Sequence, residues 1–220
     1  MSPPPRPQSG GSDNATDYRQ VFLVRVHRLL RLGYERLDRS ACDAADEEEI
    51  SGELGDAIEF VLNDTSSPPW MDFFHVHNEK PVRDPERKGK RRRRLDIRID
   101  SAEQRPRTRF PFEAKRLAEG HGVGTYLGED GLGRFLRGQY ARSEDMAGML
   151  GYVQSGEPEA WAASIGRTLS ESPQKYCIVE GMNWQHNLLL GGVEQTYRSS
   201  HRRQRFNRVI DIYHTLLNFS

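Results

Sequence analysis

The stretch RRRRLDIRIDSAEQRPRTRFPFEAKRL, residues 91–117, predicts two short strands joined by a polar turn. Apolar residues alternate with polar ones in both halves: Leu95, Ile97 and Ile99 in the first, and Phe110, Phe112 and Ala114 in the second. Because successive side chains of a strand point to opposite faces, this alternation indicates a β-hairpin with one apolar face.

Three charged residues lie at matching ends of the two predicted strands. Sixteen residues separate Asp96 from Glu113, which is enough to finish one strand, turn and return. Glu113 and Lys115 project from one face of the second strand because they are two positions apart. Antiparallel pairing is therefore expected to bring Asp96 close to Glu113 and Lys115.

Two carboxylates and an ammonium group at one end of a hairpin are suited to phosphodiester cleavage. Carboxylate oxygens bind Mg²⁺, which usually takes one or two protein carboxylates together with waters and substrate phosphate. A lysine can hold an attacking water or stabilise the negative charge of the reaction. The competing interpretation is a half-buried hairpin whose outer face is merely charged, and the three residues alone do not decide between the two.

The pattern of Asp96 followed by Glu113-Ala114-Lys115 resembles the signature of the PD-(D/E)XK nuclease superfamily, with Leu95 in place of the usual proline. The resemblance covers about residues 46–180. It implies an α/β restriction-endonuclease-like fold, with an αβββαβ core whose central mixed sheet is flanked by helices, here with an extra N-terminal helix. It further implies that Asp96, Glu113 and the Ala114 carbonyl hold Mg²⁺, for which Mn²⁺ should substitute, and that Lys115 orients the attacking water.

The helix that precedes the hairpin is expected to supply a further carboxylate. Asp46 and Glu49 have the spacing of a capping box, and an apolar helical stripe follows from Ile50. Members of the superfamily commonly place an acid on this helix, where it helps organise the metal or its waters. The resemblance points to Glu53 as this catalytic and metal-binding residue, or failing it to Glu49. A solvated acidic face is the alternative for most of these acids.

The other elements follow from periodicity. An amphipathic helix with a basic outer face is predicted over residues 16–37, with an apolar stripe of Val21, Val24, Leu29, Leu32 and Leu37. A strand is expected near residues 73–77, a helix from about Leu132, and a helix from about Ser143 that packs through Met146, Met149, Leu150 and Val153. A helix over 157–170 and a strand over 175–180 come next, and 208–219 fits a strand or a helix, with strand preferred.

The charges are balanced in number but not in position. Lys plus Arg and Asp plus Glu each total 32, so the net charge says nothing about partners. Residues 41–64 hold nine acids and no Lys or Arg, whereas residues 80–116 hold fifteen Lys or Arg against six acids. This segregation predicts a locally positive surface. Because Lys and Arg contacts to phosphate dominate nucleic-acid affinity, the candidate contacts are Lys90, Arg91, Arg92, Arg93, Arg94, Arg134, Arg137, Arg202 and Arg203.

One domain is expected over residues 15–220, after a disordered tail over residues 1–14 that is rich in Pro, Gly and Ser. The N-terminus has no apolar core, so no signal peptide is expected. No apolar run is long enough to span a bilayer, and the two cysteines supply no disulfide framework. These features predict a cytoplasmic protein with no membrane partner.

The leading hypothesis is a Mg²⁺-dependent nuclease that acts on nucleic acid, with DNA preferred over RNA. The resemblance implies a role in bacterial anti-phage defence or restriction, with a homodimer or a partner defence subunit as the assembly. Two alternatives stay open. A catalytically inactive nucleic-acid-binding or regulatory subunit would keep the fold and bind in a salt-dependent way through the basic clusters. An interaction module of a larger complex would dock through the acidic helix.

Overall fold

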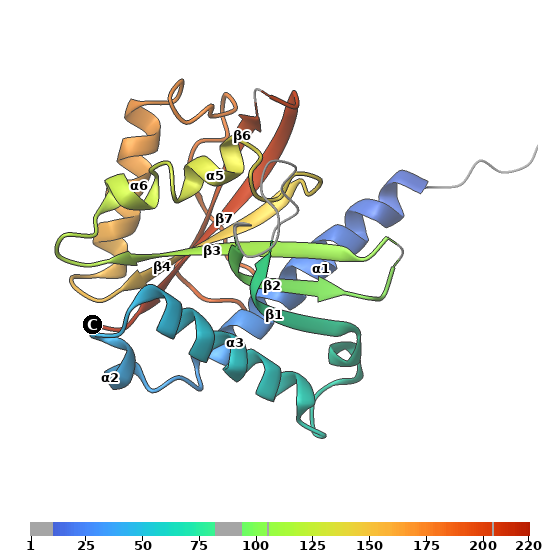
Figure 1. The fold of residues 1–220 in the computed structure, drawn as a ribbon. Coiled ribbons are helices and arrows are strands. Elements are labelled where there is room, and N and C mark those ends of the chain that lie inside the picture. Colours follow the sequence, from blue (N-terminus) through green and yellow to red (C-terminus); the bar gives the residue numbers. More distant parts are fainter. Residues whose placement is uncertain (1–10, 82–93, 105, 204) are drawn as a thin grey trace, which may run out of the picture.

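The computed structural model describes residues 11–81, 94–104, 106–203 and 205–220, which form a mixed α/β fold around a seven-stranded sheet (Figure 1). The helices are α1 (Gly11–Tyr34), α2 (Arg39–Cys42), α3 (Glu47–Asn63), α4 (Val123–Tyr126), α5 (Leu132–Leu136) and α6 (Pro158–Glu171), and a 3-10 turn, η1, covers Pro69–Phe73. The strands are β1 (Phe74–Pro81), β2 (Arg94–Ser101), β3 (Thr108–Leu117), β4 (Met146–Val153), β5 (Gln185–His186), β6 (Thr196–Arg203) and β7 (Arg208–Asn218).

The sheet combines an antiparallel half and a parallel centre. Its strand order is β1-β2-β3-β4-β7-β6-β5. The pairs β3–β4 and β4–β7 are parallel, and the other neighbours are antiparallel. Parallel neighbours need a crossover connection. The segment with α4 and α5 makes the first crossover, and the segment from α6 to β6 makes the second.

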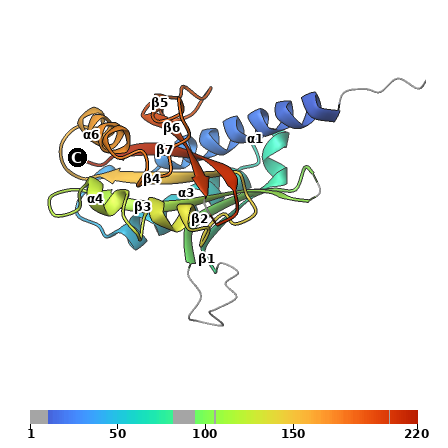
Figure 2. The ribbon, with the colours of Figure 1, turned by 90° about the horizontal axis from the view of Figure 1, so that it is seen from above.

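Helices cover both faces of the sheet. Figure 1 shows α2 and α3 on one side of β3 and β4, and α5 and α6 on the other. Two apolar cores correspond to these layers. The first core joins α1 and α3 to the sheet through residues such as Phe22 and Leu54, and the second contains Tyr126, Phe135 and Ile165. In both views the first turns of α1 extend beyond the rest of the described chain (Figure 2).

Several predicted elements are confirmed. The 91–117 stretch forms the antiparallel β2–β3 hairpin, and α3 begins at the predicted cap, where the Asp46 carboxylate accepts the Glu49 N–H at 2.8 Å. The strand near residues 73–77 is β1, the helices predicted from Leu132 and over 157–170 are α5 and α6, and the C-terminal segment is the strand β7. Among the described residues, no helix has the length and apolar character needed to cross a membrane.

The helix predicted from about Ser143 is wrong, because Met146–Val153 form the central strand β4. All eight residues of β4 are buried, as expected for a strand with parallel neighbours on both sides. Gly148 allows the Phe112 ring to approach, since a Cβ at this position would lie 2.2 Å from a ring carbon. A continuous apolar run fits a helix or a buried strand by period alone, and here close packing on glycine requires the strand.

The apolar stripe predicted over residues 16–37 is confirmed except at Val21, because Leu29 is buried and Val24, Leu32 and Leu37 pack against the core. The buried face of α1 consists of Phe22, Leu23, Val26, Leu29 and Leu30. Val21 instead faces outward with 45% of its surface exposed. The helix thus buries a wide face against the sheet and α3, and its outer face carries apolar as well as basic residues.

Two further predictions differ from the structure. Residues 175–180 form turns and not a strand, with one isolated bridge between Ile178 and His201. Cys177 has a φ of 53°, a left-handed conformation that cannot continue a strand. Residues 11–14 of the predicted tail belong to α1, which begins at Gly11, and residues 1–10 lie outside the described part of the chain.

Candidate active site

The predicted site lies where β2 and β3 separate. The last paired residues of these strands are Ile97 and Phe112, although β2 remains paired with β1 as far as Arg94. Beyond Phe112, the Ala114 N–H donates to the Asp96 carboxylate over 2.6 Å. The side chain of Asp96 is therefore tied to the Glu113–Lys115 segment across the gap that opens between the two strands.

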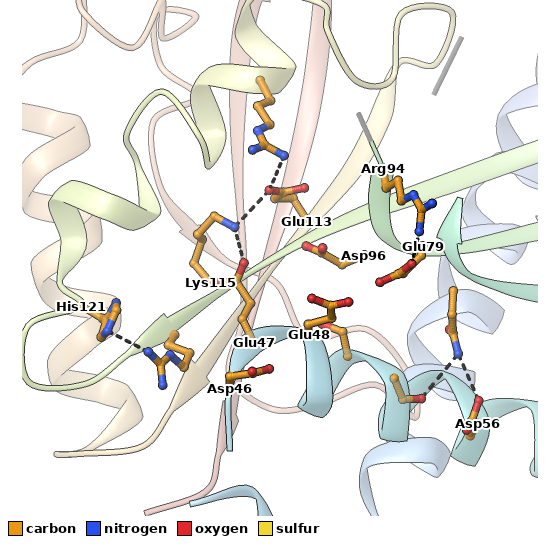
Figure 3. Close-up of a pocket in the computed structure, with 15 residues that line it drawn as sticks. Asp46, Glu47, Glu48, Asp56, Glu79, Arg94, Asp96, Glu113, Lys115 and His121 are labelled. Carbon is orange, nitrogen blue, oxygen red and sulfur yellow. Dashed lines mark hydrogen bonds and ion pairs between the residues drawn. The ribbon is translucent and has the colours of Figure 1, made fainter. Parts of the chain in front are cut away.

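Glu113 is the most enclosed charged residue of this gap. Its side chain is 1% exposed, and its Oε1 lies 3.0 Å from Lys115 Nζ and 3.2 Å from Arg134 Nη1. The other oxygen, Oε2, is buried and has no hydrogen-bond partner among the described residues. Figure 3 shows the carboxylates of Glu113 and Asp96 pointing into the same part of the cavity. The structure thus brings together Asp96, Glu113 and Lys115, as the sequence predicted.

Lys115 is held by three oxygens. In addition to Glu113, its Nζ lies 2.5 Å from Glu47 Oε1 and donates to the Ala114 carbonyl over 2.6 Å. Glu47 is the first residue of α3, so the Asp46 cap that starts this helix also places the Glu47 carboxylate over the hairpin (Figure 3). The ammonium group is consequently fixed at the inner end of the gap.

A cavity of about 970 Å³ opens from these residues. Seven carboxylates and four basic groups line it: Asp46, Glu47, Glu48, Asp56, Glu79, Asp96 and Glu113, with Arg94, Lys115, Arg116 and Arg134. Acids outnumber bases around the cavity. Its electrostatics therefore favour a bound cation.

Burial perturbs both central carboxylates. Desolvation raises the pKa of Asp96 from 3.8 to about 6, although the Ala114 N–H and Lys115 oppose the change. Desolvation and the nearby charge of Asp96 raise the pKa of Glu113 from 4.5 to about 8, against the opposing effect of Lys115 and Arg134. Burial works to lower the pKa of Lys115, but Glu113 and Glu47 outweigh it and the pKa is raised. At neutral pH Asp96 is therefore mostly ionised and Glu113 mostly protonated, while the lysine stays protonated.

The donor set fits a small hard cation. Glu113 Oε2, for which the described residues supply no partner, the Asp96 carboxylate and the Ala114 carbonyl are all oxygens, which Mg²⁺ prefers. Within the described residues, no group of three or more His, Cys, Asp or Glu is arranged to hold a metal. Mg²⁺ needs only one or two protein carboxylates when waters and phosphate complete its shell, so two carboxylates here are compatible with it.

The α3 carboxylate that reaches the hairpin is Glu47, and neither Glu53 nor Glu49 does so. Glu53 is exposed and does not line the cavity; its charge instead contributes to the raised pKa of Cys42 at the end of α2. Glu49 also lies outside the cavity lining, and its N–H serves the Asp46 cap. The predicted helix thus does reach the hairpin, but through the carboxylate of its first residue.

The predicted basic contacts have different surroundings. Arg94 and Arg134 line the cavity, where Arg94 pairs with Glu79 and Arg134 pairs with Glu113. Arg137 and Arg202 are exposed outside it. Arg203 is 1% exposed and donates to the carbonyls of Ala141 and Glu144, so its guanidinium is not available to a ligand at the surface. Lys90, Arg91, Arg92 and Arg93 lie outside the described residues.

Sequence reasoning missed several residues of the cavity. Glu47 had a usable signal, since it directly follows the predicted cap. Glu48 and Glu79 share a hydrogen bond that raises the pKa of Glu48 and lowers that of Glu79. Glu79 has a φ of 46°, an uncommon conformation for a residue other than glycine, and no sequence pattern marks it. The pair of Arg116 and His121, 2.8 Å apart at the cavity wall, had no signal either.

Comparisons with known proteins leave the class of the chain open. No family model, no curated protein and no solved structure gives a significant match to it.

Proposed function

We propose that this chain is a Mg²⁺-dependent nuclease of the PD-(D/E)XK type. The observation that carries the proposal is the convergence of Asp96, Glu113 and Lys115 in one cavity, with a buried Glu113 oxygen that has no partner in the described part of the chain. Buried carboxylates with raised pKa values are uncommon where they serve only the fold, and such groups gather at functional sites.

The order of elements supports the same proposal. The chain runs α3, β1, β2, β3, then α4 and α5, then β4. The first three strands form an antiparallel meander, and β4 is parallel to β3. This order is compatible with the αβββαβ arrangement that the resemblance implies, provided that β4 takes the place that the sequence analysis gave to residues 175–180.

The roles of the residues follow from their positions. Asp96, Glu113 and the Ala114 carbonyl would hold the ion, and a bound Mg²⁺ would lower the pKa of a water and stabilise charge on the phosphate. Lys115 stays a cation because Glu113 and Glu47 raise its pKa, so its charge can stabilise developing negative charge. Its three N–H groups face Glu113, Glu47 and the Ala114 carbonyl, so Nζ would donate to the attacking water once Glu113 turns to the ion. Glu47 is a positioning residue that fixes this ammonium group.

The basic groups at the cavity wall are placed to bind the phosphodiester backbone. Arg94 and Arg116 line the same cavity as the carboxylates. Arginine forks bind phosphate oxygens in pairs, so these two side chains would position the strand whose phosphate reaches Asp96 and Glu113. DNA is the proposed substrate, and RNA is its competitor in the assay.

Cleavage assays with supercoiled, linear and single-stranded DNA and with RNA test the proposal in Mg²⁺, Mn²⁺ and EDTA. The purified chain should cut in Mg²⁺ or Mn²⁺ and not in EDTA. Glu113→Ala and Lys115→Ala should each reduce cleavage by at least roughly a hundredfold, because each removes a group that acts on the reacting phosphate. Lys175→Ala is the matched control, since Lys175 is exposed and lies outside the cavity.

The helix carboxylate is tested in the same assay. Glu47→Gln should lower the cleavage rate, whereas Glu53→Gln should leave it unchanged. Cleavage that survives both Glu113→Ala and Lys115→Ala would refute the assigned site. Nucleic-acid binding that weakens with salt, without cleavage in any divalent ion, would instead identify an inactive binding subunit.

A further inference from the structure

A second groove lies along the outer face of α1, away from the active-site cavity. Its volume is about 590 Å³, and it shares no lining residue with that cavity. Residues of α1, Trp70 from η1, and the Leu190–Gly191 segment before β6 form its walls. The groove is therefore a surface that the proposed nuclease reaction leaves unexplained.

Apolar side chains form much of this groove. Val21 and Leu190 expose 45% and 84% of their surface, and Val24 and Trp70 complete the apolar wall. An exposed apolar patch that is bordered by charged residues is typical of a protein-binding surface. Burying these side chains against a partner would be favourable by about 25 cal/mol for each Å² removed from water.

Three arginines accompany the apolar wall. Arg25, Arg28 and Arg31 follow one another at three-residue intervals along α1, and none of the described residues that line the groove is acidic. Arg25 pairs with Glu103 at 2.5 Å, and Arg31 pairs with Glu35 at 3.4 Å. Among the described residues, Arg28 makes no ion pair with a carboxylate, and it is exposed. The middle position of the row is thus open to an external anion.

We propose that this groove binds an acidic peptide segment of a protein partner, one that carries apolar side chains between its carboxylates. Guanidinium forks bind carboxylates with two parallel hydrogen bonds. The Arg25–Glu103 pair shows that a carboxylate fits against this face of α1. Aspartate or glutamate would pair with Arg28, and a leucine or an aromatic side chain would cover Val21 and Leu190.

The geometry of Trp70 favours a peptide over a nucleic acid. Single strands bind by stacking bases on open aromatic rings. The guanidinium groups of Arg25 and Arg28 lie 5.2 and 5.8 Å from the centre of the Trp70 ring, and Phe74 packs against it at right angles. Two guanidinium groups and a phenyl ring thus already contact this ring, and the aliphatic side chains beside it offer nothing that recognises a base.

Fluorescence anisotropy with the full chain tests this proposal. The probe is a labelled synthetic peptide of aspartate, glutamate and leucine. The comparison peptides replace its acids by Asn and Gln or its leucines by serine, and a single-stranded oligonucleotide is a further probe. Binding is measured at about 0.1 M and about 1 M salt, between which the screening length falls from about 10 Å to about 3 Å.

The acidic peptide should bind saturably and more weakly at high salt, and both altered peptides should bind worse. Arg28→Glu should weaken binding at least about tenfold because attraction becomes repulsion, and Leu190→Ser should weaken it as well. Arg167→Glu makes the same charge change at an exposed position of α6 outside the groove and should have no effect. Circular dichroism verifies that all variants are folded.

Three results would overturn the proposal: no saturable binding of the acidic peptide, equal binding of its neutral version, or equal binding by Arg28→Glu. Oligonucleotide binding that Arg28→Glu removes would reassign the groove to nucleic acid. A change of molecular size on Arg28→Glu would reassign it to a second copy of this chain. Because the groove and the active site share no residue, these outcomes are independent of the cleavage assays.

Discussion

Replacing Glu113 by glutamine should stabilise the metal-free protein at alkaline pH. The pKa of this carboxyl is raised from 4.5 to about 8 in the folded chain, with burial as the largest cause. A raised folded-state pKa means that the proton binds more tightly to the folded form than to the unfolded form. The resulting stabilisation is complete below pH 4.5 and is lost as the pH rises through about 8.

The size of this effect follows from the same pKa values. The difference between 4.5 and about 8 is equivalent to about 5 kcal/mol, at about 1.4 kcal/mol for each pH unit. Movement of Lys115 and Arg134 toward the ionised carboxylate would reduce this energy difference. We therefore expect Glu113→Gln to raise the free energy of unfolding by about 2–5 kcal/mol at pH 9 and to change it little at pH 4.

Urea unfolding followed by circular dichroism, in EDTA at pH 4, 7 and 9, measures this difference. Glu53→Gln is the matched control, because it makes the same substitution at an exposed position of α3. A Glu113→Gln variant that is no more stable than wild type at pH 9 would refute the reasoning. So would a stability difference that does not increase between pH 4 and pH 9.

Mg²⁺ should produce the complementary result. A ligand that binds only the folded state stabilises it by about 1.4 kcal/mol when its concentration is about tenfold above Kd. The wild type should gain this stability at pH 9, and Glu113→Gln should not, since it lacks a carboxylate for the ion. Equal stabilisation of both proteins would show that Glu113 is not a metal ligand.

Three further predictions concern the fold. Burial lowers the pKa of His27 and of His201 from 6.5 to about 4. The free energy of unfolding present above pH 6.5 should therefore fall by up to roughly 3 kcal/mol for each histidine as the pH drops to 4. Urea unfolding measured between pH 7 and pH 4 tests this, and a stability that does not change with pH would contradict it. Arg203→Ala should destabilise the chain by about 2–4 kcal/mol in urea unfolding, because two buried carbonyls lose their donor. Gly148→Ala should cost about 1–3 kcal/mol by crowding a phenyl ring, whereas Gly52→Ala, which meets open space, should not.

The hairpin was predictable because its signal is local. Period-two alternation defines both strands, and a short polar turn leaves few registers, so the approach of Asp96 to Glu113 follows from the chain itself. The position of the helix carboxylate does not follow in the same way. Glu47 and Glu53 are six residues apart, which rotates them by about 240° around the helix axis. Only the packing of α3 on the sheet decides which of them faces the hairpin.

The other differences also arise from tertiary packing. The apolar run of β4 fits two periods, and it is a strand because Gly148 admits the Phe112 ring from the neighbouring strand. Arg202 and Arg203 are adjacent in a basic cluster, yet alternation along β6 exposes the first and buries the second. Charge clusters in a sequence identify candidates for a surface but do not state which members reach it.

The pairing of β3 explains how the site can have a fixed backbone and still hold a carboxylate whose ionised form destabilises the fold. It pairs with β4 through Phe112–Leu117, so the backbone of residues 113–115 is fixed on that side. On its other side β3 is paired with β2 only from Ile97 to Ser101, and side chains of the two strands enclose the space beside the unpaired residues 94–96. A chain shaped only for stability would fill this space with apolar residues, since an ionised Glu113 opposes folding above neutral pH. If Glu113→Gln raises the stability of the fold and abolishes cleavage, Glu113 is a residue retained for function at the expense of stability.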